Sequence, residues 1–215
     1  MEFYSVRVLR TLEEKTLAKR LLYDVYVKEL GWIPPSGNPS NLKIQESSLG
    51  NILVDDYDSV SIQVGAFHGE KLIGVHRMIN RLNDRFEVEN YIQIPKFLQQ
   101  DSSYELNRLA IKKNYRNSPI FPLMVTAEVR YMIRYKCKYA ITTAIFPDPG
   151  NLFCKMGTTR INFPDFKYHV SDPKPVSLIV FFFEEKDNFN QLFRVTDKLI
   201  QKGKVKQLDI DELCP

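Results

Sequence analysis

The chain has 215 residues, of which 44% are hydrophobic and 26% are charged, and this composition is typical of a globular domain with a continuous core. The net charge of +4 is too small to indicate nucleic-acid binding, although it permits a basic patch for an acidic partner. The longest apolar run, VSLIVFFF, is much shorter than the roughly 20 residues of a membrane helix. We therefore expect one soluble, cytoplasmic domain over residues 1–215, with no membrane span and no nucleic-acid partner.

The N-terminal part begins with the alternating stretch FYSVRVL, which predicts a strand. The following TLEE predicts a capping box between Thr11 and Glu14, and so the start of a helix. Its expected apolar stripe consists of Leu17, Leu21, Leu22, Val25 and Tyr26. Gly31 and three prolines end this helix, and we expect an irregular, substrate-side segment over residues 31–58.

The rest of the chain alternates predicted strands and helices. The expected elements are a hairpin at 59–79, a strand at 103–111, a helix at 118–138, a strand at 139–146, a short helix at 149–156, strands at 161–170 and 176–185, and a helix at 187–203 capped by Asp187. The polar stretch 80–100 has no clear period. This order predicts an α/β (α+β) fold with a mixed sheet and helices on both faces, followed by a C-terminal helical extension at about 187–215.

The strand at 103–111 carries two opposite charges, Glu105 and Arg108. Residues three apart point to opposite faces of a regular strand, so the two side chains share a site only if a β-bulge lies between them. A bulge also leaves backbone N–H groups unpaired, and such donors could hold the oxyanion of an acyl-transfer reaction. The alternative is a structural ion pair.

Clustered acidic residues, Asp55, Asp56 and Asp58, precede the hairpin. They could bind a substrate ammonium or sulfonium group, or they could form an ordinary turn. Arg77, on the second hairpin strand, could anchor a carboxylate or could be an edge-strand arginine. The three cysteines and three histidines show no CxxC or HxxxH spacing, so neither a disulfide framework nor a metal site is expected.

Four motifs, VYVKELGW, DDYD, GVHRM and YELNRLAI, occur in an order and spacing that resemble those of acyltransferases with the Gcn5-related N-acetyltransferase (GNAT) fold. LFCKMGTTRINFPDFKYHV at 152–170 extends the resemblance to the branch of acyl-homoserine lactone (autoinducer) synthases and long-chain N-acyl amino acid synthases. The resemblance implies a GNAT-like three-layer fold with a mixed sheet of about seven strands, of which the fourth and fifth splay apart.

The same resemblance implies roles for individual residues. Glu105 and Arg108 would be catalytic, whereas Tyr26, Trp32, Asp55, Asp58 and Arg77 would bind substrate. Two positions depart from the pattern: Leu22 replaces an arginine of autoinducer synthases, and Phe153 replaces the tyrosine acid of many acetyltransferases. From Arg116 onward, Pro119 and Phe121 stand where the glycine-rich coenzyme A cradle would have small residues, so coenzyme A is not the expected acyl carrier.

The implied activity is transfer of a fatty acyl group from acyl carrier protein to the amine of an amino acid or related molecule, without a cofactor. A rival is autoinducer synthesis for quorum sensing, with S-adenosylmethionine as co-substrate; another is a non-catalytic acyl-carrier or lipid-binding module. The acidic carrier protein would bind a basic surface. The candidates for this surface are Lys112, Lys113, Arg116, Arg130, Arg134 and Lys138, although a solvated helix face is the commoner explanation for such a charge run.

Overall fold

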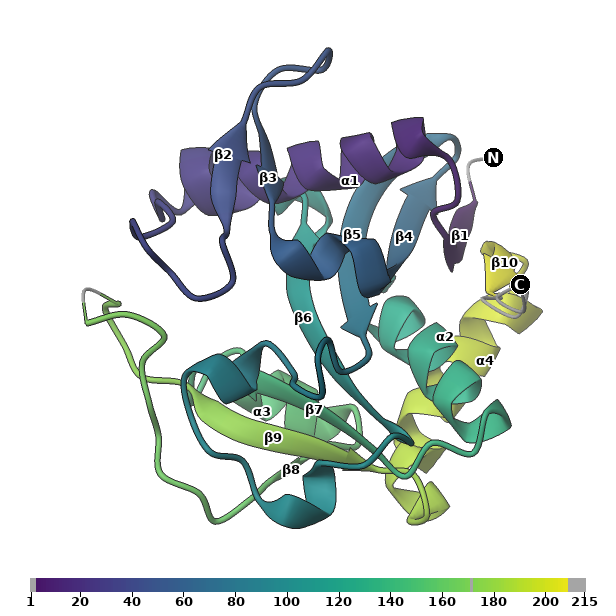
Figure 1. The fold of residues 1–215 in the computed structure, drawn as a ribbon. Helices are drawn as coiled ribbons and strands as arrows, with labels where there is room; N and C mark the ends of the chain where they lie inside the picture. The colour runs from purple at the N-terminus through teal and green to yellow at the C-terminus, as the bar shows by residue number, and fades with distance from the viewer. Residues whose placement is uncertain (1–2, 171, 209–215) are drawn as a thin grey trace.

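The computed structural model describes residues 3–170 and 172–208. A mixed sheet of eight strands runs through the molecule in the order β10-β1-β4-β5-β6-β7-β9-β8, and helices lie on both of its faces (Figure 1). Its strands are β1 (Tyr4–Val8), β4 (Ser61–His68), β5 (Lys71–Ile79), β6 (Ser103–Ile111), β7 (Tyr139–Ala144), β8 (Thr159–Arg160), β9 (Ser177–Phe182) and β10 (Val205–Leu208). The helices are α1 (Leu12–Tyr23), α2 (Ile120–Arg134), α3 (Gly150–Lys155) and α4 (Asn190–Gln201). The three-layer, GNAT-like arrangement predicted from the sequence is confirmed.

Helix α1 begins at the predicted capping box. The Thr11 hydroxyl accepts the Glu14 N–H at 3.1 Å, and the Glu14 carboxylate accepts the Thr11 N–H at 3.2 Å. The helix continues as a π-helical turn, Asp24–Glu29, which carries Tyr26 toward the sheet. The predicted stripe is buried at Leu21, Leu22 and Val25, but Leu17 is 40% exposed and lies outside it.

Two hydrophobic clusters pack on opposite faces of the sheet. Helix α1 covers one face, where its apolar residues meet Phe67, Leu72 and Val75 of the hairpin β4–β5. Helix α2 covers the other face, together with Val64 and Ala66, and α4 packs against α2. Successive residues of β5 therefore face different layers, because side chains alternate along a strand.

Strands β6 and β7 pair only near their starts. Their parallel ladder joins Ser103 to Tyr139 and ends where Glu105 lies opposite Ile141. From Leu106 onward β6 pairs with β5 alone, so the two strands diverge (Figure 1). Counted along the chain, β6 and β7 are the fourth and fifth strands of this sheet, so the predicted splay between them is confirmed.

Several local predictions are wrong. Residues 161–170 form no strand; a single bridge joins Phe166 to Val176. Helix α4 begins at Asn190 after a 3₁₀ turn, Lys186–Phe189, so Asp187 is not its cap. The segment 31–58 is not wholly irregular, because β2 (Lys43–Gln45) and β3 (Ile52–Val54) form a small hairpin.

The C-terminal extension is not only helical. After α4, strand β10 pairs in parallel with β1 and adds one strand to the edge of the sheet, which explains the count of eight. Residues 209–215 of the predicted extension lie outside the described residues. No helix within residues 3–170 and 172–208 combines the length and apolarity needed to cross a membrane.

Candidate active site

The predicted bulge is present in β6. Arg77 lies opposite Asn107, and Val75 lies opposite Ala110, so two residues, Arg108 and Leu109, face the single residue between them on β5. Arg108 has a φ of +55°, a left-handed conformation that is uncommon for a residue with a side chain. The extra residue resets the alternation of the strand, and the Arg108 guanidinium therefore reaches the same buried network that Glu105 joins.

Arg77 stands at the centre of a buried network on the α1 face of the sheet. Its Nη1 donates to Asp55 Oδ1 at 2.6 Å and to Asp58 Oδ1 at 3.1 Å. Its Nη2 donates to Glu87 Oε2 at 2.9 Å. Asp55 and Asp58 also form a capping box for the 3₁₀ turn Asp56–Val60, as the turn interpretation of this acidic motif predicts.

Arg108 joins the network from the bulge. Its Nε and Nη2 donate to Asp55 Oδ2 at 3.2 and 3.0 Å, and Nη2 also donates to Glu87. Glu105 and Arg108 therefore do not form the direct ion pair that was one of the expectations. The link runs from Arg108 through Glu87 to Asn107, and from Asn107 to Glu105.

Glu105 is 2% exposed and both of its oxygens accept hydrogen bonds. Oε2 accepts the Val88 N–H at 3.1 Å, and Oε1 accepts Asn107 Nδ2 at 3.2 Å. Asn107 is oriented in turn by Arg77 Nε, which donates to Asn107 Oδ1 at 2.8 Å, and by Glu87, which accepts from its amide at 2.7 Å. The carboxyl group is thus fixed in position at the point where β6 and β7 part.

The network has an excess of acidic groups. It holds the carboxyl groups of Asp55, Asp58, Glu87 and Glu105 and the cations of Lys19, Arg77 and Arg108. Burial and the charge of Glu87 raise the pKa of Glu105 to about 8. Burial also acts to raise the pKa of Asp55, but Arg77 and Arg108 outweigh it and lower that pKa. With Glu105 protonated at neutral pH, the negative charges of the other three carboxylates balance the three cations.

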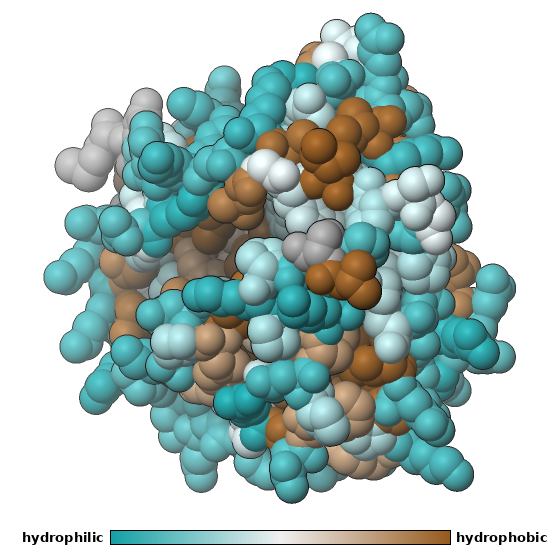
Figure 2. Space-filling view, turned by 90° about the vertical axis from the view of Figure 1, so that its left-hand side faces the viewer, coloured by the Kyte–Doolittle hydropathy of each residue, from teal (hydrophilic) through white to brown (hydrophobic). Residues whose placement is uncertain are grey.

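The predicted aromatic residues lie beside the bulge. Tyr26 donates its hydroxyl hydrogen bond to the carbonyl oxygen of Leu109 at 3.1 Å, and Trp32 packs edge-on against Tyr26 with ring centres 6.0 Å apart. Trp32 Nε1 also donates to Asp172 Oδ1 at 3.4 Å, which joins the segment after α1 to the loop before β9. Figure 2 shows the face on which these segments lie, and apolar side chains line a hollow in it.

Tyr168, in the loop between β8 and β9, approaches the site from the β7 side. Its hydroxyl oxygen lies 3.0 Å from Thr143 Oγ1, and its ring packs edge-on against Tyr91 with centres 4.8 Å apart. Burial and the neighbouring Glu105 raise the pKa of Tyr168 well above its ordinary value. By contrast, Phe153 is buried against Phe121, with ring centres 4.9 Å apart.

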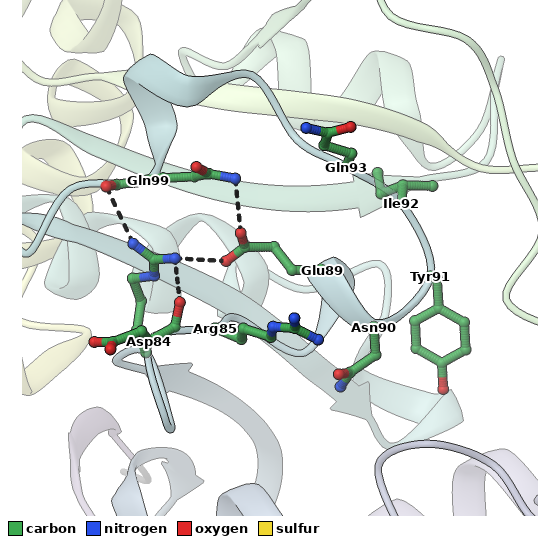
Figure 3. Close-up of a pocket in the computed structure, with 9 residues that line it drawn as sticks. Asp84, Arg85, Glu89, Asn90, Tyr91, Ile92, Gln93 and Gln99 are labelled. Carbon is green, nitrogen blue, oxygen red and sulfur yellow. Dashed lines mark hydrogen bonds and ion pairs between the residues drawn. The ribbon is translucent and has the colours of Figure 1, made fainter.

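A polar pocket of about 540 Å³ lies beside the network (Figure 3), and neither catalytic candidate, Glu105 or Arg108, lines it. Its lining residues are Arg81, Asp84, Arg85, Glu89, Asn90, Tyr91, Ile92, Gln93 and Gln99. Arg81 is held there by Glu89 at 3.4 Å and by the carbonyl oxygen of Gln99 at 3.1 Å. Asn90 connects this pocket to the network through Tyr57: its amide donates to the Tyr57 hydroxyl at 2.9 Å, and the Tyr57 N–H donates to Asp55 Oδ1 at 3.0 Å.

The six basic residues predicted to bind a carrier protein do not come together. Lys112, Lys113 and Arg116 precede α2, whereas Arg130, Arg134 and Lys138 lie at its other end, about 20 Å away along the helix. Arg116 is paired with Glu29 at 2.8 Å, and Arg130 with Asp197 at 2.8 Å. The structure thus offers two separate basic surfaces.

Sequence reasoning missed Glu87 and Tyr168. Glu87 lies between β5 and β6, in the stretch 80–100 that has no recognisable period, and Tyr168 lies in the predicted strand that does not form. The only signal for Glu87 was an acidic residue, within FEVEN, between two apolar ones that are both buried here.

Comparisons with known proteins agree with this fold. Residues 21–126 match the model of the family described as an acetyltransferase (GNAT) domain. The structure is similar to that of FeeM, an N-acyl amino acid synthase from uncultured soil microbes, with 15% identity, a TM-score of 0.67, and coverage of 91% of this chain and 99% of FeeM. A search of curated protein sequences found no match.

Two acyl-homoserine lactone synthases are also similar in structure. BjaI, which is coenzyme A-dependent, has 15% identity and a TM-score of 0.66, with 95% of this chain and 93% of BjaI covered. LasI has 12% identity and a TM-score of 0.60, with 88% of this chain and 95% of LasI covered. These structures represent the branch that the motifs indicated. Residues 21–126 therefore match the GNAT acetyltransferase family, and the described chain has the GNAT fold of these acyltransferases.

Proposed function

We propose that the protein is an N-acyltransferase that moves a fatty acyl group from acyl carrier protein to the amine of an amino acid or a related small molecule. The observation that carries this proposal is the bulge at Arg108, which accompanies a buried carboxyl group, Glu105, at the point where β6 and β7 part. The similarity in fold to an N-acyl amino acid synthase supports it.

In this proposal the acyl thioester lies in the gap between β6 and β7. Its carbonyl oxygen accepts a hydrogen bond from a backbone N–H of the bulged strand, whose edge no longer pairs with β7 beyond Glu105. Fixed backbone donors stabilise the negative charge that develops on this oxygen when the amine attacks. The bulge therefore serves both the oxyanion and the placement of the acidic network.

Glu105 accepts the proton that the amine loses, directly or through a water molecule. An α-amino group has a pKa near 8, so the pKa of about 8 for Glu105 matches it, and neither group is far from its working protonation state. The new C–N bond forms as the C–S bond breaks, and the sulfur leaves as a thiolate because thiols have a pKa of about 8.5. The proton on Glu105 then passes to the thiolate or to water.

Asp55 and Arg77 act on the substrate indirectly in this proposal. The Asp55 side chain is 1% exposed and that of Arg77 is 3% exposed, and each is occupied by the other. Arg108, with 16% of its side chain exposed, reaches solvent, whereas Arg77 does not. We assign direct contact with the amine substrate to Arg108, Trp32 and Tyr26, and positioning to Asp55, Asp58 and Arg77.

The start of α2 favours a carrier-protein donor over coenzyme A. Pro119 and Pro122 lack an N–H group, and the Ile120 N–H already donates to the Ser118 hydroxyl at 3.4 Å. Few donors therefore remain for the pyrophosphate of coenzyme A. Because BjaI, of similar fold, is coenzyme A-dependent, the assay must include both donors.

The test is an acyl-transfer assay with acyl carrier protein or coenzyme A as donor and a panel of amino acids and S-adenosylmethionine as acceptors. We expect N-acyl amino acids from the carrier-protein donor, identified by mass spectrometry. An acyl-homoserine lactone from S-adenosylmethionine would establish the rival function, which the similarity to BjaI and LasI favours and the buried Leu22 opposes. Carrier-protein binding without any product would indicate the non-catalytic module.

The two basic surfaces give a second test of the donor. We expect the change Lys113→Glu, before α2, to weaken association with acyl carrier protein more than the change Arg134→Glu at the other end. Attraction between opposite charges falls with ionic strength, so the difference should shrink as salt is added. Equal effects of both changes would show that the basic residues before α2 have no specific role in binding the carrier protein.

A further inference from the structure

Tyr168 is a half-buried tyrosine beside the gap, and the mechanism above does not use its hydroxyl. Thr143, its partner at 3.0 Å, lies on β7 two residues beyond Ile141, which is the last residue of β7 that pairs with β6. The Tyr168 hydroxyl therefore lies on the β7 side of the gap, whereas Glu105 and the bulge lie on the β6 side. Tyr168 packs against the hydrophobic cluster that contains Ile141, which lies opposite Glu105, and Val88, whose N–H binds Glu105.

The ring of Tyr168 is held by its aromatic neighbours. Tyr91 packs edge-on against it at 4.8 Å, and Phe166 does so at 5.2 Å. Phe166 is itself held by the backbone bridge to Val176, the residue before β9. A hydroxyl with an orientation fixed in this way costs little reorganisation when charge develops near it.

We propose, on the basis of the function inferred above, that Tyr168 is a further catalytic residue, whose hydroxyl donates a hydrogen bond to the sulfur of the acyl thioester as the C–S bond breaks. Thr143 holds this hydroxyl in the absence of substrate and releases it to the sulfur in the complex. Tyr168 takes the place of the acid that Phe153 cannot supply, but it comes from a different element.

The role of Tyr168 is hydrogen-bond donation rather than proton transfer. Its pKa lies well above its ordinary value, whereas a thiol has a pKa of about 8.5, so the proton stays on the tyrosine oxygen. The electron pair of the C–S bond goes to sulfur, and the thiolate takes its proton afterwards from Glu105 or water. No oxidant, reductant or metal enters this balance.

The experiment compares Tyr168→Phe with the wild type on two donors of the same acyl group, the acyl carrier protein thioester and an aryl thioester. We expect kcat with the carrier-protein donor to fall about 10- to 100-fold, with little change in the KM for the amine. The leaving group of the aryl thioester is the thiolate of a more acidic thiol, which depends less on a hydrogen bond to sulfur. The fall in kcat with this donor should therefore be about threefold or less. An equal loss with both donors, or no loss, would overturn the proposal.

The control is Tyr139→Phe on β7, the strand of Thr143; the ring of Tyr139 packs against Phe97 and Phe182. It should keep the wild-type rate, and unfolding temperatures of both variants should confirm an intact fold.

A second measurement does not need turnover. The thiol of holo-acyl carrier protein is titrated by thiolate absorbance in complex with each protein, and the wild type should lower its pKa more than Tyr168→Phe does. An unchanged thiol pKa on binding wild type would refute the role of Tyr168, whereas a wild type that lowers it but acylates no amine would refute the proposed function alone.

Discussion

Two neighbouring residues of β5 enter two buried ionisable clusters on opposite faces of the sheet. His76 faces α2, where its Nδ1 lies 2.9 Å from Glu128 Oε1, and both side chains are 1% exposed. Arg77 faces α1 and joins Asp55, Asp58 and Glu87. Burial alone does not separate the clusters, since both are enclosed.

The clusters differ in charge balance and in access. The pair of His76 and Glu128 holds one acid and one base within the main hydrophobic core. The network around Arg77 has one more acid than base, reaches solvent at Lys19 and Arg108, and adjoins a strand that is bulged and unpaired on one side. An unbalanced, accessible cluster at broken backbone pairing indicates function, whereas a closed, balanced pair indicates packing.

The largest expected effect is on stability, from Arg77→Met. This change leaves Asp55 and Glu87 buried with fewer cations, and the free energy of unfolding should fall by about 3–5 kcal/mol. Arg160→Met, which removes an exposed pair with Asp165, should cost less than about 1 kcal/mol in the same denaturant titration. Similar losses for the two variants would show that the network is not energetically distinct from the surface.

The second effect is the pH dependence of stability. The pKa of Glu105 is raised in the folded state, to about 8, so between about pH 5 and 8 the folded state binds a proton that the unfolded state has released. This contribution is complete below the unfolded pKa and is lost as the pH rises through 8, by up to about 1.4 kcal/mol per pH unit. Glu105→Gln should therefore show a flatter decline of unfolding free energy from pH 5 to 8; a parallel decline would contradict the raised pKa.

The third effect concerns the other cluster. Glu128→Leu leaves the buried His76 imidazole without its acceptor and should cost about 1–3 kcal/mol of stability. Turnover per folded molecule, measured well below the unfolding temperature, should stay within about twofold of wild type, since the pair lies on the far face of the sheet. A large loss of kcat would show that the α2 face also takes part in catalysis.

The smallest effect is a shift of a pH midpoint. Glu87→Gln removes a negative charge that raises the pKa of Glu105, so the midpoint of the rate against pH should move below that of the wild type. Glu89→Gln is the matched control, because Glu89 pairs with Arg81 and Gln99 rather than with Glu105 or Asn107. If both variants shift the midpoint equally, Glu87 has no specific role in setting it.

The sequence predicted those features that depend on local chemistry. The cap at Thr11, the hairpin before Ile79 and the bulge before Arg108 follow from spacing and from the parity of strand residues. The acidic motif and Arg77 were also identified, although their mutual pairing was not, because it requires the turn after β3 to lie over β5.

Other features depend on contacts between distant segments. Strand β10 forms because the edge of β1 is available to it, and no pattern within VKQL shows this. The stretch 161–170 alternates like a strand, but its only β-bridge joins Phe166 to Val176, and Tyr168 lies in a loop beside Thr143. Glu87 is polar in an aperiodic stretch, and its importance follows only from the two arginines that converge on it.

The central claim is that Glu105, held beside the bulge, accepts the proton of the attacking amine. It is tested most directly by the pH dependence of kcat for wild type and Glu105→Gln at saturating donor and acceptor. We predict a wild-type rate that rises with pH to a plateau with a midpoint of about 8, and a variant about 10²- to 10⁴-fold slower that lacks this midpoint. A variant with the wild-type rate and the same midpoint would contradict the account.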